Sequence, residues 1–173
     1  MTDVKPAATA GDDRAFREAM RTLAGGVVIL TTWIEERPWG MTISACCSVS
    51  AEPPRVLVSV GHLTCVHAAI KAGNRFGVNV LGSDQKHIAE FGATPGQAKF
   101  LDTYLGESCL TEDTATPRVG DALAHLDCVV ADQLEVSDHT LLVGDVERVT
   151  VAGDDREPLL YFDRSYRRVG GNL

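Results

Sequence analysis

The hydrophobic pattern of the chain changes from a helical to an extended period near residue 25. Before that point, Asp12 or Asp13 can cap a short helix. The apolar side chains of this helix share one face and are Phe16, Ala19, Met20 and Leu23. After Gly25 and Gly26, apolar residues alternate with polar ones or form β-branched runs, as is typical of strands. The segments that predict strands are residues 27–33, 40–50, 55–60, 75–81, 122–136 and 140–151, with a last strand near 159–162 and 166–169.

Short helices separate some of these strands. One opens at Thr64 and ends near Gly73, and a second is capped by Ser83 and runs to Phe91, where Gly92 closes it. Residues 94–115 predict loop and short helix. About seven strands, mostly joined by short turns, favour a mainly β antiparallel barrel over a doubly wound sheet. We expect one domain over residues 13–170, preceded by a disordered lead over residues 1–12.

Charge and composition exclude several classes of function. The net charge of −8 argues against a nucleic-acid groove or an anionic membrane surface as the main partner. No stretch reaches the ~20 apolar residues of a membrane span, and the first residues lack the apolar core of a signal peptide. We therefore expect a cytoplasmic protein that binds neither nucleic acid nor membrane. The five cysteines lack CxxC spacing, which indicates small buried side chains or free thiols.

Several catalytic motifs are absent from the sequence. There is no GxGxxG dinucleotide fingerprint, no GxxxxGK[ST] phosphate loop, no HExxH and no GxSxG. His62 and His67 are five residues apart, but no cysteine or acid near them in the sequence completes a zinc set. The sequence therefore predicts no metal site, and no residue that acts as a catalytic acid, base or nucleophile.

The segment 40–50 has an unusual face of small side chains. Strict alternation assigns one face to the core, with Met41, Ile43, Ala45, Cys47 and Val49. The other face holds only Thr42, Ser44, Cys46, Ser48 and Ser50. Small hydroxyl side chains let a flat ligand approach the backbone and still offer hydrogen bonds. The alternative, a solvated outer face of a barrel strand, has about equal weight on this pattern alone.

Two further segments can carry chemistry. Ser59 to Thr64 is a strand end, a glycine and a helix start, and a helix N-terminus offers free N–H groups to a phosphate. Taken alone, Thr64 is more simply a helix cap. Asp138 and His139 lie at the tip of a predicted hairpin, where extended geometry points them in opposite directions, so they need not pair. A solvated surface histidine is the simple alternative for His139.

The joint order of several short motifs resembles one family. The motifs are LAGGVVILTT, GMT, SVSAEPP, VNVL, LDCVV and SDHTLLVGDVERV. Over residues 14–169 the chain is similar to the short-chain flavin reductases. These NAD(P)H:flavin oxidoreductases act as the small component of two-component flavin-dependent monooxygenases.

The resemblance implies a split β-barrel that dimerises and holds a flavin, FAD or FMN, near the dimer interface. Its motifs place the flavin-binding role on Thr42, Ser44, Ala45, Cys46, Ser59, Gly61, His62, Thr64, Lys99 and Phe100. It places His139 beside the nicotinamide. The implied activity is reduction of the flavin by NADH or NADPH, with reduced flavin passed to a partner monooxygenase. Because the cofactors carry the chemistry, no acid or nucleophile is required of the protein.

Two alternatives to this activity remain at the level of the sequence. One is a flavin-binding module without turnover, such as a carrier or sensor on the same dimeric barrel, and the other is a purely structural dimeric barrel. The long strands independently predict a two-fold homodimer because they carry apolar residues on both faces. These residues are Leu126, Cys128 and Val130 on one side and Leu123, Val129 and Ala131 on the other.

Overall fold

The structure is a computed structural model that describes residues 13–106, 110–111, 114–153 and 155–170. The predicted lead over residues 1–12 lies outside this range. Seven antiparallel strands form the main sheet in the order β3-β2-β6-β9-β10-β5-β4. They are β2 (Val28–Ile34), β3 (Arg37–Ile43), β4 (Cys46–Ala51), β5 (Pro54–Gly61), β6 (Arg75–Val80), β9 (Ala124–Val136) and β10 (His139–Val151). The predicted mainly β class is confirmed.

The two edges of this sheet are consecutive in the chain. β3 and β4 occupy opposite edges, yet only Ser44 and Ala45 connect them. A link of two residues spans at most ~10 Å, so the sheet must curl until its edges come close together. In the described strands the edges are not hydrogen-bonded to each other, and the curled sheet stays open rather than closing into a complete barrel.

The prediction of one continuous strand over residues 40–50 was wrong. The chain leaves β3 after Ile43 and begins β4 at Cys46, where its partner changes from β2 to β5. The break also reverses the alternation. Cys46, assigned to the polar face, packs against the core, whereas Cys47 and Val49, assigned to the core, are exposed. A period of two holds only while the strand is continuous, so it cannot carry a face across the junction.

The predicted helix at Thr64 is confirmed. α2 (Cys65–Gly73) begins where the Thr64 hydroxyl accepts the N–H of His67, and it ends at Asn74, whose φ of 57° is left-handed. The next helical segment is a short 3₁₀ turn (Ser83–Gln85) followed by α3 (Lys86–Ala93). Gly92 therefore lies inside α3 and does not close it. A Cβ at Gly92 would collide with the backbone and hydroxyl of Thr42, so glycine is needed for the helix to approach β3.

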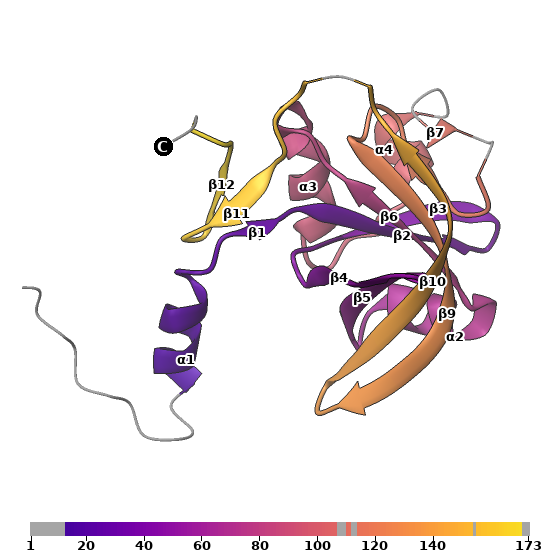
Figure 1. The fold of residues 1–173 in the computed structure, drawn as a ribbon, viewed down its shortest axis with the longest axis horizontal. Helices are drawn as coiled ribbons and strands as arrows, with labels where there is room; N and C mark the ends of the chain where they lie inside the picture. The colour runs from indigo at the N-terminus through magenta and orange to yellow at the C-terminus, as the bar shows by residue number, and fades with distance from the viewer. Residues whose placement is uncertain (1–12, 107–109, 112–113, 154, 171–173) are drawn as a thin grey trace, which may run out of the picture.

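A small unit at the two ends of the chain stands beside the main sheet. It contains α1 (Asp13–Met20), β1 (Gly25–Gly26), β11 (Leu160–Phe162) and β12 (Ser165–Arg167), and β1 pairs with β11. The predicted last strand is therefore two short strands. Figure 1 shows α1 standing away from the sheet, and no residue of α1 is buried. α4 (Leu101–Leu105) and the pair β7 (Leu110–Thr111) and β8 (Arg118–Val119) complete the described elements.

The two long strands β9 and β10 form the predicted hairpin. Their ends project beyond the rest of the sheet in Figure 1. Leu126, Cys128 and Val130 pack into the core, whereas Leu134 and Val136 near the tip are exposed. The hairpin thus packs into the core at one end, and near its tip the apolar side chains of β9 are exposed while β10 stays paired with β5.

Two hydrophobic clusters lie on the two faces of the sheet. One gathers side chains inside the curl under α2, including Val58, Phe76 and Cys128. The other lies under α3 and α4 and includes Ile29, Ile88 and Leu101. None of the helices in the described part of the chain is long and apolar enough to cross a membrane.

Candidate functional site

A cavity of about 750 Å³ opens at the β3–β4 junction. Its walls come from α1, from β1, from the junction itself and from the hairpin of β11 and β12. The junction contributes Ser44, Ala45 and Cys46, and β1 contributes Gly25 and Gly26, so most of this wall consists of small side chains. The volume falls within the range of sites that hold small ligands and cofactors, roughly 300–1,000 Å³. Three predicted flavin-binding residues therefore share one cavity.

The chemistry of this wall is neutral at the junction and charged at the rim. Burial raises the pKa of the Cys46 thiol to about 11, so the thiol stays protonated and is a poor nucleophile near neutral pH. At the rim, Arg21 Nε donates to Asp163 Oδ1 at 3.0 Å, and its Nη1 donates to Glu18 Oε2 at 2.8 Å. These ion pairs attach α1 to the turn between β11 and β12 on the far side of the cavity.

Thr42 does not face the large cavity. Its hydroxyl donates to the carbonyl of Ala89 at 2.7 Å, which fixes β3 against α3. It also borders a smaller cavity of about 180 Å³, which shares Ser44 and Tyr161 with the larger one. Thr42 is therefore placed to position the junction rather than to present its hydroxyl to a ligand.

A second group of predicted residues meets where β5 ends and β10 begins. Gly61 pairs with His139, and a Cβ on Gly61 would lie 3.6 Å from His139 Nε2. The N–H of His62 donates to the carbonyl of Asp138 at 2.9 Å, and the Thr64 hydroxyl donates to the carbonyl of Gly61 at 2.8 Å. The loop 61–64 and the hairpin tip are thus held together by backbone and side-chain bonds.

Ser59 connects the two groups. It lies two residues before Gly61 on β5, and its N–H donates to the carbonyl of Ala45 at 3.1 Å. The cavity at the junction and the loop at the hairpin tip therefore follow the same edge of the sheet. A long ligand could lie along this edge with its two ends at the two groups.

The prediction that Asp138 and His139 need not pair is corrected by the structure. His139 Nδ1 lies 2.8 Å from Asp138 Oδ1, because the residues turn at the hairpin tip instead of continuing an extended strand. The hydrogen bond from His139 lowers the pKa of the Asp138 carboxyl. With its Nδ1–H engaged by Asp138, a neutral His139 ring presents Nε2 as an acceptor, and only the protonated ring can donate from that atom.

Lys99 and Phe100 lie beside β3, the strand at the opposite edge of the main sheet, where Phe100 forms an isolated bridge with Trp39. The carbonyl of Lys99 accepts the N–H of Gly40 at 3.1 Å. Phe100 packs edge-on against Trp39 with ring centroids 4.9 Å apart, and the Arg37 guanidinium lies 3.9 Å above the Phe100 ring. Burial lowers the pKa of the Lys99 ammonium, and the nearby Cys65 opposes that shift. Phe100 is therefore a packing residue, while Lys99 is half-buried near the start of α2.

The structure adds residues that the sequence pattern did not indicate. Tyr161 and Phe162 line the large cavity because β11 pairs with β1, a contact between the two ends of the chain. Glu135 lies beside the two histidines of the loop and helix: its Oε2 is 2.6 Å from His62 Nε2. The conclusion that no acid accompanies His62 and His67 was wrong, because Glu135 is near them in space and far away along the chain.

Comparisons with known proteins agree on one family. The family model described as the flavin reductase like domain matches residues 20–170. The chain is 37% identical over 151 residues to the reductase component of 4-nitrophenol 4-monooxygenase/4-nitrocatechol 2-monooxygenase from Rhodococcus opacus, covering 87% of this chain and 78% of that protein. It is 32% identical over 162 residues to NADH:riboflavin 5'-phosphate oxidoreductase from Streptomyces pristinaespiralis, covering 93% of this chain and 90% of that protein.

Solved structures give the same result. NADH:FAD oxidoreductase SgcE6 from Streptomyces globisporus C-1027, solved in complex with NAD and FAD fragments, superposes with a TM-score of 0.83. The two chains are 28% identical, and the match covers 96% of this chain and 98% of that one. Flavin reductase PheA2 in its native state superposes with a TM-score of 0.79 at 32% identity, covering 92% of this chain and 99% of that one.

Proposed function

The chain belongs to the flavin reductase like domain family, and from this premise we propose that it supplies free reduced flavin to a partner monooxygenase. It is an NAD(P)H:flavin oxidoreductase whose cofactors are FAD or FMN and a nicotinamide nucleotide. The observation that carries the proposal is the 750 Å³ cavity. It lies at the β3–β4 junction, where Ser44, Ala45 and Cys46 follow shortly after the motif GMT.

The wall of this cavity suits a flat aromatic ring system. Glycines and small side chains leave room beside the backbone of the junction, and a Cβ on Gly26 would meet no atom within 4 Å. Ser44 can offer a hydroxyl, and the protonated Cys46 thiol adds no charge. In this proposal Ser44, Ala45 and Cys46 bind the flavin ring. Thr42 fixes β3 against α3, and Phe100 packs against Trp39 of the same strand.

The loop 61–64 would hold the phosphate end of the flavin. The first turn of α2 has a partial positive charge that favours an anion, and its N–H groups have no partner within the helix, although the Thr64 hydroxyl accepts that of His67. Gly61, His62 and Thr64 form the approach to that turn, Ser59 connects it to the junction, and Lys99 is the nearby cation. His139 adjoins Gly61 and would contact the nicotinamide.

Hydride transfer needs little chemistry from such a site. The nicotinamide and the flavin supply the hydride donor and acceptor when both are bound. The protein then has to align the two rings at roughly 3–3.5 Å and exclude competing geometries. No described residue at the junction is required as an acid, base or nucleophile, which agrees with the neutral Cys46 thiol.

A two-fold homodimer completes the proposal. Phe16 and Leu23, next to the cavity, expose 66% of their surface, and Leu134 on the projecting hairpin exposes 61%. Exposed apolar side chains that gather into a contiguous patch usually mark an interface. A second copy that covers them would also add a wall to the cavity, which is consistent with a flavin held near the interface.

One assay separates the enzyme from a binding module. Purified protein is mixed with NADH or NADPH and free FAD or FMN, and the absorbance of the reduced nicotinamide is followed. Turnover far above the rate without protein is the expected result. Saturable flavin binding without nicotinamide oxidation would refute the proposed activity and favour a carrier or sensor.

A second measurement tests the release of reduced flavin. The protein and NADH are placed anaerobically in one chamber, and flavin is placed behind a membrane that retains protein. Bleaching of flavin in the protein-free chamber, faster than in a control without enzyme, is expected if reduced flavin leaves by diffusion. Flavin that stays bound and bleaches only with the protein would contradict supply to a separate monooxygenase.

A further inference from the structure

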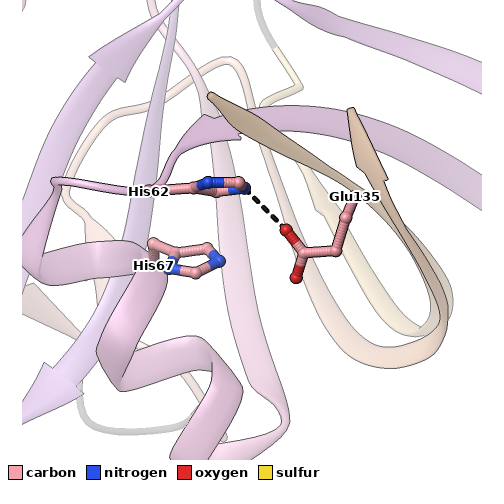
Figure 2. Close-up of side chains that lie close together, drawn as sticks. All are labelled: His62, His67 and Glu135. Atoms are coloured by element: carbon pink, nitrogen blue, oxygen red, sulfur yellow. Dashed lines mark ion pairs between the residues drawn. The ribbon is translucent and has the colours of Figure 1, made fainter. Parts of the chain in front are cut away.

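Two imidazoles and one carboxylate meet beside the tip of the β9–β10 hairpin. His62 comes from the loop after β5, His67 from the first turn of α2, and Glu135 from the end of β9. Each offers one ligand atom, and these three atoms lie within 4.8 Å of one another. Figure 2 shows both rings and the carboxylate directed toward the same space. From this geometry we propose that His62, His67 and Glu135 bind a divalent transition-metal ion of the Zn²⁺ class.

The contacts of His62 indicate that it lacks a satisfactory partner. Its Nε2 is enclosed by protein atoms, and no hydrogen bond to that atom is made by the described residues. Glu135 Oε2 is only 2.6 Å away, yet it lies outside the alignment that an N–H donor needs. A buried ring nitrogen close to a carboxylate oxygen, but poorly bonded to it, is the arrangement that a metal ion between the two would satisfy.

The neighbours of the cluster are placed as outer partners of a metal site. The Thr140 hydroxyl donates to Glu135 Oε2 at 3.0 Å and contacts His67 Nε2 at 2.9 Å, so a metal bound through that nitrogen would replace the contact with His67 and leave Thr140 on the carboxylate. Lys71 Nζ lies 3.6 Å from the other carboxylate oxygen, Oε1. The carboxylate can therefore give one oxygen to a metal and keep Lys71 on the other. Bonds of this kind orient ligands and influence metal affinity.

The charge state of the cluster fits a cation. The hydrogen bond from Thr140 and the nearby His62, Lys71 and His67 lower the pKa of Glu135, so its carboxylate is ionised near neutral pH. Histidine ligates metals through an unprotonated ring nitrogen, so the two imidazoles add donor atoms without adding negative charge.

Two histidines and one carboxylate are a donor set that suits Zn²⁺ and its neighbours better than Ca²⁺ or Mg²⁺, which prefer oxygen ligands. Ligand bonds of ~2.0–2.1 Å at tetrahedral angles separate donor atoms by roughly 3.3 Å. His62 and Glu135 would move apart slightly, and His67 would move inward. All three side chains are partly or fully exposed, so these rotations are available.

Cobalt binding to the whole protein tests the site without flavin or turnover. Protein freed of metal with a chelator is titrated with Co²⁺, whose d–d absorption reports tetrahedral coordination, and Zn²⁺ is then added in competition. One Co²⁺ per chain is expected, displaced by one Zn²⁺. Glu135→Gln and His67→Ala should each weaken binding at least about tenfold. The matched controls Glu90→Gln and His87→Ala, both at exposed positions on α3, should bind as the unchanged protein does.

Exposed thiols are the main alternative ligands. Cys65→Ser should leave the cobalt spectrum unchanged, because Cys65 is exposed and is not a member of the cluster. A strong thiolate-to-cobalt charge-transfer band that this change abolishes would overturn the proposal. Absence of stoichiometric binding, or equal binding by Glu135→Gln and the unchanged protein, would also overturn it. If His67→Ala does not fold, Glu135→Gln carries the test alone, since Glu135 is at an exposed position. Failure of the metal site leaves the proposed reductase activity untouched.

Discussion

His139→Ala is the change that most directly tests where the nicotinamide binds. The side chain of His139 exposes 49% of its surface, and its partner Asp138 exposes 88%. Such an exposed pair contributes little to stability, so the variant should fold and melt almost as the unchanged protein does. Any kinetic effect therefore reports a lost ligand contact rather than a damaged fold.

The expected magnitude follows from one hydrogen bond. Because Asp138 engages Nδ1, the neutral ring of His139 offers Nε2 to the carboxamide N–H₂ of a nicotinamide. Loss of one such bond and its desolvation costs about 1–2 kcal/mol, which is roughly a 5- to 30-fold drop in kcat/KM for NADH. The change should be mainly in KM, because a contact to the unreacting carboxamide stabilises the ground state and the transition state alike.

Steady-state kinetics with varied NADH and saturating flavin measure this effect, and flavin fluorescence titration measures flavin affinity. Flavin affinity should stay nearly intact, and His87→Ala on the exposed face of α3 should behave as the unchanged protein. Removal of His139 should also raise the pKa of Asp138 toward its ordinary value, which carboxyl NMR titration follows. Unchanged KM and kcat for NADH and NADPH alike would refute the placement of the nicotinamide beside His139.

Three further predictions concern the cavity, the core and the assembly. Ser44→Leu should weaken flavin binding at least about tenfold by filling the cavity, whereas Ser48→Leu on the exposed face of β4 should leave binding unchanged. Both variants should melt near the temperature of the unchanged protein, because each site is exposed. Early melting of Ser44→Leu with normal flavin binding would show that the residue belongs to the core. Burial lowers the pKa of His125, so the unfolded chain binds more protons at this site, and the free energy of unfolding should increase as the pH rises toward the ordinary histidine pKa of ~6.5. His125→Gln should flatten that slope in chemical denaturation. Sedimentation at micromolar concentration should give twice the chain mass of 18.5 kDa, and Leu134→Glu should shift the protein toward the monomer. A mass near 18.5 kDa for the unchanged protein would refute the dimer.

Local patterns determined much of the fold. The alternation along β9 and β10 and the runs in β2, β5 and β6 predicted their strands to within a few residues. Thr64 marked the start of α2 because a threonine cap acts on N–H groups only two or three residues away. The order of the short motifs also indicated the family, because each motif is a contiguous run of residues that can be recognised without knowledge of the tertiary structure.

Long-range pairing decided the rest. The alternation over residues 40–50 gave no sign that β3 and β4 pair with different partners, because the reversal at Ser44 and Ala45 is imposed by the closing curl of the sheet. The same cause moved Cys46, rather than Cys47, against the core, whereas Thr42 lies before the break and keeps its predicted face. The faces of these two thiols could therefore be fixed only by the tertiary fold.

The clusters of side chains show the same division. The sequence marked Ser44, Gly61, His62 and His139 as candidates because each lies in a motif or at the end of an element. It could not mark Glu135, which reaches His62 only because β10 pairs with both β9 and β5. It also missed the bond between Asp138 and His139, since the hairpin turn removes the alternation that would separate them. Residue types and local geometry are properties of short segments, whereas contacts across the sheet depend on register, which the whole curled sheet determines.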